Sequence, residues 1–259
     1  MEDGFERLRK VSEGGAPIAA LAAYDYPTAR LLDEAGVDLI LVGDSLGMVV
    51  LGYENTTYVT LAEMRHHTRA VRRGVDRAVL VADLPYHTYE IPEQAVDSAR
   101  QLIDDGADAV KLEGGVEIEG QIRAIIDAGI PVIGHLGMLP QHIEEEGRYR
   151  KKGKTDEESE RLLRDARLLD QLGVRAVVLE SMFKKVARAI TESVSMPTIG
   201  IGAGQGCDGQ ILVLHDLIGS FPWFCPPFVQ PKTNVAEAIS QAARAYIDEV
   251  RSETPDAAT

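Results

Sequence analysis

The amino-acid sequence predicts a (β/α)8 barrel, and three observations lead to this fold class. Strand-like runs of apolar residues alternate with amphipathic helical stretches almost from end to end. The strand-like runs are apolar throughout rather than alternating, which is typical of parallel strands covered on both faces. There are eight such runs in 259 residues, a length close to the ~250 residues that a barrel of this kind needs.

The predicted strands are rich in Val, Ile, Leu and Ala and are bounded by polar residues or glycine. In order along the chain they cover residues 17–25, 37–44, 77–85, 108–115, 130–137, 175–181, 197–204 and 210–219. An open doubly wound sheet is the structural alternative. It would be favoured by a glycine-rich dinucleotide loop after the first strand, which here ends in "AAYDYPTAR".

The segments between the strands have the periodicity of amphipathic helices, most clearly at 26–36, 92–106 and 156–173. Several helical stretches end in a glycine that precedes a short turn, which is the signature of a left-handed helix cap. These glycines are Gly36, Gly106, Gly129 and Gly173.

The domain prediction is one barrel domain over residues 1–259, without a linker or a second domain. It comprises an extra N-terminal helix at about 3–14, the barrel at about 16–250 and a disordered tail at about 252–259. The closing helix is expected from about residue 234 to 251. Residues 142–155 are polar and charged, and we expect them to form a long loop over the catalytic face, in the position of a lid.

Composition excludes several classes of function. There are 41 Asp and Glu against 27 Lys and Arg, a net charge of −14 that argues against binding to nucleic acid or anionic membranes. The acidic excess is compatible with adaptation to high salt. Two cysteines, Cys207 and Cys225, provide neither a disulfide framework nor a zinc pattern. The N-terminus is charged and no long apolar run is present, so the expected location is the cytoplasm.

Chemically capable side chains occur where the predicted strands end. The carboxyl ends of barrel strands carry the active site in enzymes of this fold. Each tip residue alone has a structural explanation, such as a helix N-cap for Asp or Ser. A lysine inside a barrel must find an anion, however, and the whole set predicts a catalytic site. The tip residues are Asp25, Asp44, Ser45, Asp83, Lys111, Glu113, His135 and Glu180, with "GIGAG" at 200–204.

The residue types narrow the chemistry. Carboxylates without cysteine or several histidines suit a hard divalent ion, Mg²⁺ first. A nearby lysine supplies a positive charge for a substrate carboxylate. Together they describe a site for a small 2-oxo acid, whose oxygens chelate the metal and whose neighbouring carbon becomes acidic as an enolate forms. Glu180, off the metal, is the candidate proton acceptor.

Five long stretches of the chain are specific enough to compare with known families: "LILVGDSLGMVVLGY", "VADLPYHTY", "GADAVKLEGG", "GIPVIGHLGMLPQ" and "PTIGIGAGQGCDGQILVLHDLIG". They resemble the signature sequences of ketopantoate hydroxymethyltransferases (3-methyl-2-oxobutanoate hydroxymethyltransferases), and the resemblance covers roughly residues 16–250. It implies a metal-dependent barrel of the phosphoenolpyruvate mutase/isocitrate lyase-like superfamily. The implied reaction is hydroxymethyl transfer from 5,10-methylenetetrahydrofolate to 3-methyl-2-oxobutanoate, giving 2-dehydropantoate for pantothenate and coenzyme A biosynthesis.

The resemblance also implies roles for individual residues. Asp44, Asp83 and Glu113 would be the metal ligands, for one Mg²⁺ per subunit. Asp44 and Asp83 would also face the substrate, with Ser45, Lys111 and His135 as its other contacts, and Glu180 would be the catalytic base. The implied assembly is a homodecamer.

Three segments depart from the family pattern: "ESMFKKVA" after Glu180, "EEEGRYRKKGKT" in the loop after the fifth strand, and "SFPWFCPPFVQPKTN" at 220–234. They lie where we expect the folate and the lid, so the identity of the reduced pterin stays open. The first alternative is another metal-dependent oxo-acid lyase or mutase of the superfamily. The second is a non-catalytic barrel that binds a phosphate compound through residues 200–204.

Overall fold

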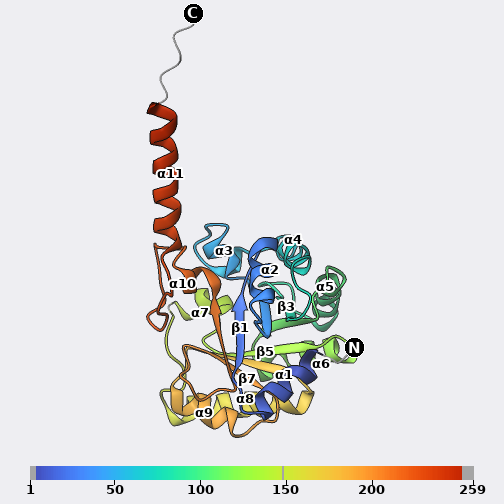
Figure 1. Ribbon diagram of the computed structural model, residues 1–259. Coiled ribbons are helices and arrows are strands. Elements are labelled where there is room, and N and C mark those ends of the chain that lie inside the picture. Colours follow the sequence, from blue (N-terminus) through green and yellow to red (C-terminus); the bar gives the residue numbers. More distant parts are fainter. Residues whose placement is uncertain (1–3, 148, 253–259) are drawn as a thin grey trace, which may run out of the picture. The chain divides into compact units, whose positions relative to one another are not determined.

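A computed structural model describes residues 4–147 and 149–252 of the chain (Figure 1). Within these residues, eight parallel strands form a closed barrel in the order of the sequence, which confirms the predicted (β/α)8 fold. The strands are β1 Ile18–Ala22, β2 Leu39–Val42, β3 Val79–Asp83, β4 Ala109–Glu113, β5 Val132–Gly137, β6 Ala176–Glu180, β7 Thr198–Ile201 and β8 Gly209–Val213.

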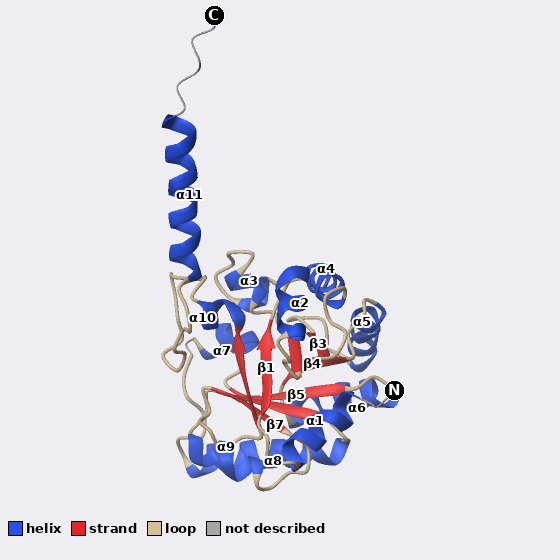
Figure 2. Cartoon of the chain, viewed as in Figure 1, coloured by secondary structure: helices blue, strands red, loops and turns tan. Residues whose placement is uncertain are grey.

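Within residues 4–212, the helices between successive strands lie outside the barrel wall (Figure 2). The longer helices of the chain are α1 Gly4–Glu13, α2 Tyr26–Glu34, α4 Leu61–Arg72, α5 Pro92–Asp104, α6 Glu119–Asp127, α8 Asp156–Leu172, α9 Lys184–Thr191 and α11 Val235–Ser252. Short helical turns are α3 Leu46–Val49, η1 Thr56–Tyr58, η2 Val116–Ile118, η3 Pro140–His142, α7 Ile143–Glu146 and α10 Leu214–Ile218. The expected extra helix before the barrel is α1, whose Phe5 and Leu8 are buried.

The helix ends follow their local sequence. Asp25 caps α2, because its Oδ1 accepts the Thr28 N–H at 3.0 Å. Thr155 caps α8 through the Glu158 N–H, and the first turn of that helix is acidic, as its dipole favours. All four glycines predicted as caps have positive φ; Gly173, with φ +86°, ends α8.

The eighth predicted strand is partly wrong. Only Gly209–Val213 forms β8, whereas Leu214–Ile218, inside the predicted strand 210–219, is the helical turn α10. A short apolar run has no periodicity that separates a strand from a buried helix. Gly219, with φ +63°, caps this helical turn.

The chain divides into two compact units, Met1–Leu212 and Val213–Thr259. The first unit holds α1 to α9, β1 to β7 and most of β8; the second holds α10 and α11. The expectation of a single domain over 1–259 stays a prediction, and residues 253–259 of the predicted tail lie outside the described residues. No helix among the described residues is long and apolar enough to cross a membrane.

Three aspartates fix the register of neighbouring strands at the amino-terminal end of the barrel. Each immediately precedes a strand and accepts a backbone N–H from the strand before it. Asp38 binds Ala19 N at 2.9 Å, Asp108 binds Leu80 N at 2.8 Å, and Asp208 binds Thr198 N at 2.8 Å. The strand pairs β1–β2, β3–β4 and β7–β8 are therefore held together at the end opposite the predicted site.

The segment 142–155 contains the short helix α7 and a bridge to the chain after β6. Lys152 N donates to Ser181 O, and Phe183 N donates to Lys152 O, each at 2.9 Å. Burial, followed by the charges of Glu180, Asp44 and Glu113, raises the pKa of Tyr149 in this segment. The role of the segment as a lid stays a prediction.

Candidate active site

The carboxyl ends of β2 to β6 bring the predicted tip residues together at one end of the barrel. All but one of their side chains are almost inaccessible to solvent; Glu180 is 15% exposed. The residues gathered here are Asp44, Asp83, Lys111, Glu113, His135 and Glu180.

Strand register explains why these side chains meet. Asp83 on β3 is the direct partner of Lys111 on β4, and Glu113, two residues on, is the partner of His135 on β5. Residues two apart on a strand point to the same face, so Lys111 and Glu113 both face the barrel interior. Glu180 closes β6 opposite Gly137. A Cβ at Gly137 would lie 2.2 Å from Glu180 O, so only glycine fits there.

Lys111 finds its expected anion in Asp83. Its Nζ lies 3.0 Å from Asp83 Oδ1 and 3.2 Å from His135 Nδ1. Burial opposes a charged lysine, but Asp83, Glu113 and Asp44 outweigh burial and raise the pKa of Lys111. The lysine is therefore a permanent cation in the barrel interior.

The carboxylates of Asp44 and Asp83 are held close to each other. Asp44 N donates to Asp83 Oδ2 at 3.1 Å. Burial, followed by the charges of Asp83 and Glu113, raises the pKa of Asp44 well above its usual range. Burial also raises the pKa of Asp83, although Lys111 opposes the shift. The surroundings thus disfavour the ionised form of both carboxyl groups.

His135 links two glutamates. Its Nδ1 lies 3.2 Å from Glu113 Oε1, and its Nε2 lies 3.2 Å from Glu180 Oε2. Burial and Lys111 oppose protonation of the ring, but Glu113 and Glu180 outweigh them and raise the pKa of His135 to about 9. For Glu113, burial acts against ionisation, while His135 and Lys111 lower the pKa.

Gln141 and Tyr89 belong to the site and were not predicted from the sequence. The Gln141 side chain donates to Asp44 Oδ2 at 2.8 Å and to Leu84 O at 3.0 Å, and accepts from the Tyr89 hydroxyl. Its backbone N–H donates to Glu113 Oε2 at 3.0 Å. The only sequence signal was its place in "GHLGMLPQ", six residues after His135.

The other predicted tip residues have simpler surroundings. Ser45 Oγ lies 2.8 Å from the Tyr24 hydroxyl, which orients it. Asp25 serves as the α2 cap. In the 200–204 segment, a Cβ at Gly200 would lie 3.0 Å from Cys207 Sγ, so this glycine permits close packing.

Two buried carboxylate oxygens of the site, Asp83 Oδ1 and Glu113 Oε1, have ion-pair neighbours but no hydrogen bond. Across residues 4–147 and 149–252, no group of three or more His, Cys, Asp or Glu side chains is arranged as a ready metal site. The carboxylates are separate oxygen donors around a lysine, with capacity to bind a further cation or polar ligand.

Comparison with known proteins decides the family. A sequence profile described as ketopantoate hydroxymethyltransferase matches residues 4–256. The chain is also 52% identical over 246 residues to a 3-methyl-2-oxobutanoate hydroxymethyltransferase of Thermoanaerobacter sp. (strain X514), covering 94% of this chain and 90% of the relative. The chain belongs to the ketopantoate hydroxymethyltransferase family. It is therefore an enzyme of the hydroxymethyl-transfer reaction of pantothenate biosynthesis, as the motifs predicted, and not a non-catalytic barrel.

Solved structures place this ketopantoate hydroxymethyltransferase fold among distant barrels. 2,3-Dimethylmalate lyase, a member of the PEP mutase/isocitrate lyase superfamily, aligns with a TM-score of 0.61 and 17% identity, covering 99% of this chain and 90% of that one. Phosphonopyruvate hydrolase in complex with oxalate and Mg²⁺ aligns with a TM-score of 0.64 and 16% identity, covering 100% and 92%. These likenesses confirm the predicted barrel fold.

Proposed function

We propose that the chain transfers a hydroxymethyl group from 5,10-methylenetetrahydrofolate to 3-methyl-2-oxobutanoate, giving 2-dehydropantoate, at the carboxyl end of β2 to β6. One observation carries the proposal. A buried cation, Lys111, is surrounded by the carboxylates of Asp44, Asp83 and Glu113, beside Glu180, the most exposed acid of the group. This combination of a cation, oxygen donors and a base suits a small anionic oxo acid.

The residues present fit a Mg²⁺ ion by the chemistry of their donors. Asp44, Asp83 and Glu113 offer hard oxygen donors, two of which lack hydrogen bonds. Burial, followed by the charges of Asp83 and Glu113, raises the pKa of Asp44, and a cation bound among these carboxylates would oppose that repulsion. The relative phosphonopyruvate hydrolase was crystallised with oxalate and Mg²⁺. When bound, Mg²⁺ supplies Lewis acidity that withdraws electrons from the oxo and carboxylate oxygens of the substrate.

Lys111 and Ser45 bind the carboxylate end of the oxo acid in this proposal. The ammonium group has three N–H donors and forms an ion pair with Asp83 Oδ1 at 3.0 Å. The Ser45 hydroxyl, held by Tyr24, provides a neutral donor at the tip of β2. Because Lys111 keeps its charge, it orients the substrate throughout the reaction.

Glu180 removes the proton from C3 of the oxo acid. The two electrons of the C3–H bond form the C2=C3 double bond while the C2=O π electrons move onto the oxo oxygen, and the proton passes to a Glu180 carboxylate oxygen. The C2=C3 electrons then attack the methylene carbon of the folate as the C2=O bond re-forms, and the bond from that carbon to N10 breaks, its electron pair taking up a proton on N10. Water replaces N5 at the same carbon and gives its proton to N5, so that the hydroxymethyl product and tetrahydrofolate leave. His135 Nε2, 3.2 Å from Glu180 Oε2, fixes the orientation of the base.

Proton exchange tests the proposal without the folate. We expect ¹H NMR in D₂O to show loss of the C3–H signal of 3-methyl-2-oxobutanoate with wild-type protein and Mg²⁺. Exchange should stop with EDTA and fall at least about 10²-fold in Glu180→Gln, because general bases contribute about 10²–10⁴-fold. The control is Glu119→Gln, which alters an exposed carboxylate of α6 that pairs with Arg123.

Exchange in Glu180→Gln at the wild-type rate would refute the assignment of the base. If the wild-type protein shows no exchange with Mg²⁺, tetrahydrofolate is added. Absence of exchange even then would refute 3-methyl-2-oxobutanoate as the substrate.

We further propose a homodecamer located in the cytoplasm, with an acidic surface suited to high salt. Support comes from the family resemblance and from the net charge of −14. Sedimentation equilibrium at low and high salt tests the assembly, and a monomer under both conditions would contradict it.

A further inference from the structure

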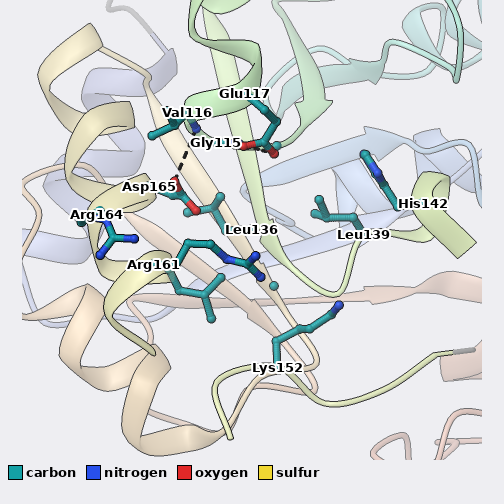
Figure 3. Close-up of a pocket in the computed structure, with 13 residues that line it drawn as sticks. Gly115, Val116, Glu117, Leu136, Leu139, His142, Lys152, Arg161, Arg164 and Asp165 are labelled. Atoms are coloured by element: carbon teal, nitrogen blue, oxygen red, sulfur yellow. Dashed lines mark hydrogen bonds between the residues drawn. The ribbon is translucent and has the colours of Figure 1, made fainter. Parts of the chain in front are cut away.

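A cavity of about 500 Å³ lies between the ends of β4 and β5 and the amino-terminal half of α8 (Figure 3). Its wall includes Gly114, Gly137, Lys152, Arg161 and Asp165. None of the residues assigned above to metal, oxo acid or proton transfer belongs to this wall. The cavity is therefore a separate feature that the proposed chemistry has not used.

The cavity adjoins the site through the chain segments that carry the reacting groups. Gly114 directly follows Glu113, and Gly137 is the strand partner of Glu180. Lys152 is joined through its backbone to Ser181 and Phe183, which follow Glu180. A ligand in the cavity thus lies against the outer side of the segments whose inward side chains form the site.

The charges of the wall point to an anionic ligand. Both of its acids already accept backbone N–H groups: Glu117 from Gly115 at 3.1 Å, and Asp165 from Val116 at 3.4 Å. Gly115 lacks a Cβ, which would lie 2.5 Å from the Asp165 carboxyl carbon, so Asp165 packs directly on this turn.

Arg161 is one of three cationic side chains in the wall, with Lys152 and Arg164. Within residues 4–147 and 149–252 it forms no hydrogen bond or ion pair. In Figure 3 its guanidinium and the Lys152 ammonium group extend toward the side of the cavity where His142 lies. Cations gather here in a chain whose acids outnumber its bases by 41 to 27. A planar guanidinium binds a carboxylate through two parallel hydrogen bonds.

We propose that this cavity binds the anionic glutamate tail of the reduced folate, with Arg161 as its carboxylate anchor. The inference rests on the proposed function, because that reaction uses a folate as the one-carbon donor. The pterin ring must reach the oxo acid at the barrel mouth, and the aminobenzoyl spacer separates it from the tail carboxylates. A cationic cavity beside the segments of Glu113 and Glu180 can hold the tail carboxylates of the folate while its pterin ring lies at the barrel mouth.

Steady-state kinetics of Arg161→Gln tests the proposal, with Arg167→Gln as the matched control. Arg167 is an exposed arginine on the same helix, outside the cavity wall. We expect the KM for 5,10-methylenetetrahydrofolate to rise about tenfold or more in Arg161→Gln, as loss of a charge-assisted hydrogen bond predicts. The KM for the oxo acid and the folate-free C3–H exchange should stay at wild-type values, and Arg161→Lys should restore part of the affinity.

The length of the tail provides a second readout. Wild-type protein should prefer triglutamyl over monoglutamyl donor, and Arg161→Gln should lose this preference. Equal folate KM values for Arg161→Gln and Arg167→Gln would overturn the proposal even with normal exchange. Absence of exchange and of product in wild-type protein would instead overturn the proposed function.

Discussion

Replacement of Gln141 by leucine should weaken both the fold and the proposed metal site. Gln141 is 1% exposed, and its side chain joins the tip of β2 to the segments after β3 and β5. Leucine keeps the size of the side chain and removes every polar contact that it makes. Asp44 Oδ2, the Leu84 carbonyl and the Tyr89 hydroxyl would then lose a partner inside the protein.

The expected magnitude follows from these three groups. A buried polar group left without a partner costs about 1–3 kcal/mol, so three together cost about 3–9 kcal/mol before relaxation. Burial of the leucine returns about 2 kcal/mol. We therefore expect the free energy of unfolding to fall by about 1–7 kcal/mol, against a total of about 5–15 kcal/mol for a typical domain.

Urea unfolding followed by circular dichroism, with EDTA and at one protein concentration, measures the change in stability. Isothermal titration with Mg²⁺ should also show weaker binding, about tenfold or more, because the ionised Asp44 loses a donor at 2.8 Å. The control is Gln121→Leu, which removes one bond at a half-buried position. A loss of stability no larger than in the control, with unchanged Mg²⁺ affinity, would refute the role given to Gln141.

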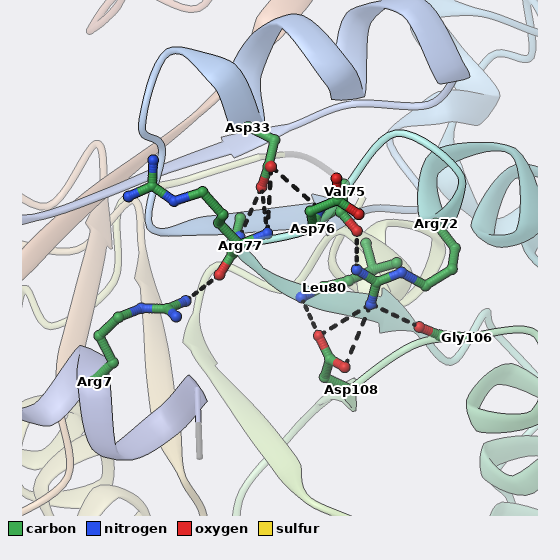
Figure 4. Close-up of polar contacts among 10 residues, drawn as sticks. Arg7, Asp33, Arg72, Val75, Asp76, Arg77, Leu80, Gly106 and Asp108 are labelled. Atoms are coloured by element: carbon green, nitrogen blue, oxygen red, sulfur yellow. Dashed lines mark hydrogen bonds and ion pairs between the residues drawn. The ribbon is translucent and has the colours of Figure 1, made fainter. Parts of the chain in front are cut away.

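Three further predictions concern stability. Burial opposes ionisation of Asp33, but its carboxylate accepts the N–H groups of residues 76–78 (Figure 4), and these hydrogen bonds lower its pKa. The contribution of Asp33 to stability is therefore present above pH 3.8 and is lost as pH falls through the lower pKa of the folded protein. Acid unfolding should become less steep in Asp33→Asn, and an unchanged acid-unfolding profile would contradict this. In metal-free protein, charged His135 contributes stability that is complete below pH 6.5 and lost as pH rises to about 9. We expect the free energy of unfolding to fall by about 3 kcal/mol over this pH range, and urea unfolding at several pH values measures it. The same pH dependence in His135→Gln would exclude His135 as its source. Gly137→Ala should lower the free energy of unfolding by more than about 2 kcal/mol and reduce C3–H exchange, because φ is +106° and a Cβ would meet Glu180 O. The control is Gly129→Ala, where φ is +80° but the space is open, and it should cost about 1 kcal/mol of stability. Equal losses of stability in the two variants would contradict the steric argument.

Most of the barrel was predictable because its strands are buried on both faces. Strands such as β3, buried at every position, require an unbroken apolar run, and such runs are visible in the sequence. The segment after Val213 was not predictable in the same way. Leu214–Ile218 is as apolar as a strand, and its helical form depends on surroundings that a short run does not encode.

The tip residues could be predicted as a set because parallel strands place their carboxyl ends together. Neither Gln141 nor Tyr89 could be found in this way, since each lies in a connection whose path is set by packing. The pairing of His135 with both Glu113 and Glu180 was equally hidden, because it depends on the register of β4, β5 and β6.

The aspartates that precede β2, β4 and β8 separate two roles along the barrel: one end aligns the strands, and the other presents the side chains of the candidate site. A slip of β4 by one residue would turn Lys111 and Glu113 from the interior to the outer face. Asp108, bound to Leu80 N at 2.8 Å (Figure 4), opposes that slip from the far end of the same strand. The strand register that orients Lys111 and Glu113 is thus stabilised at the amino-terminal end of the barrel, whereas these side chains lie at the carboxyl-terminal end. Loops and tips at the reactive end can be exchanged in evolution or design while the opposite end keeps the strands aligned.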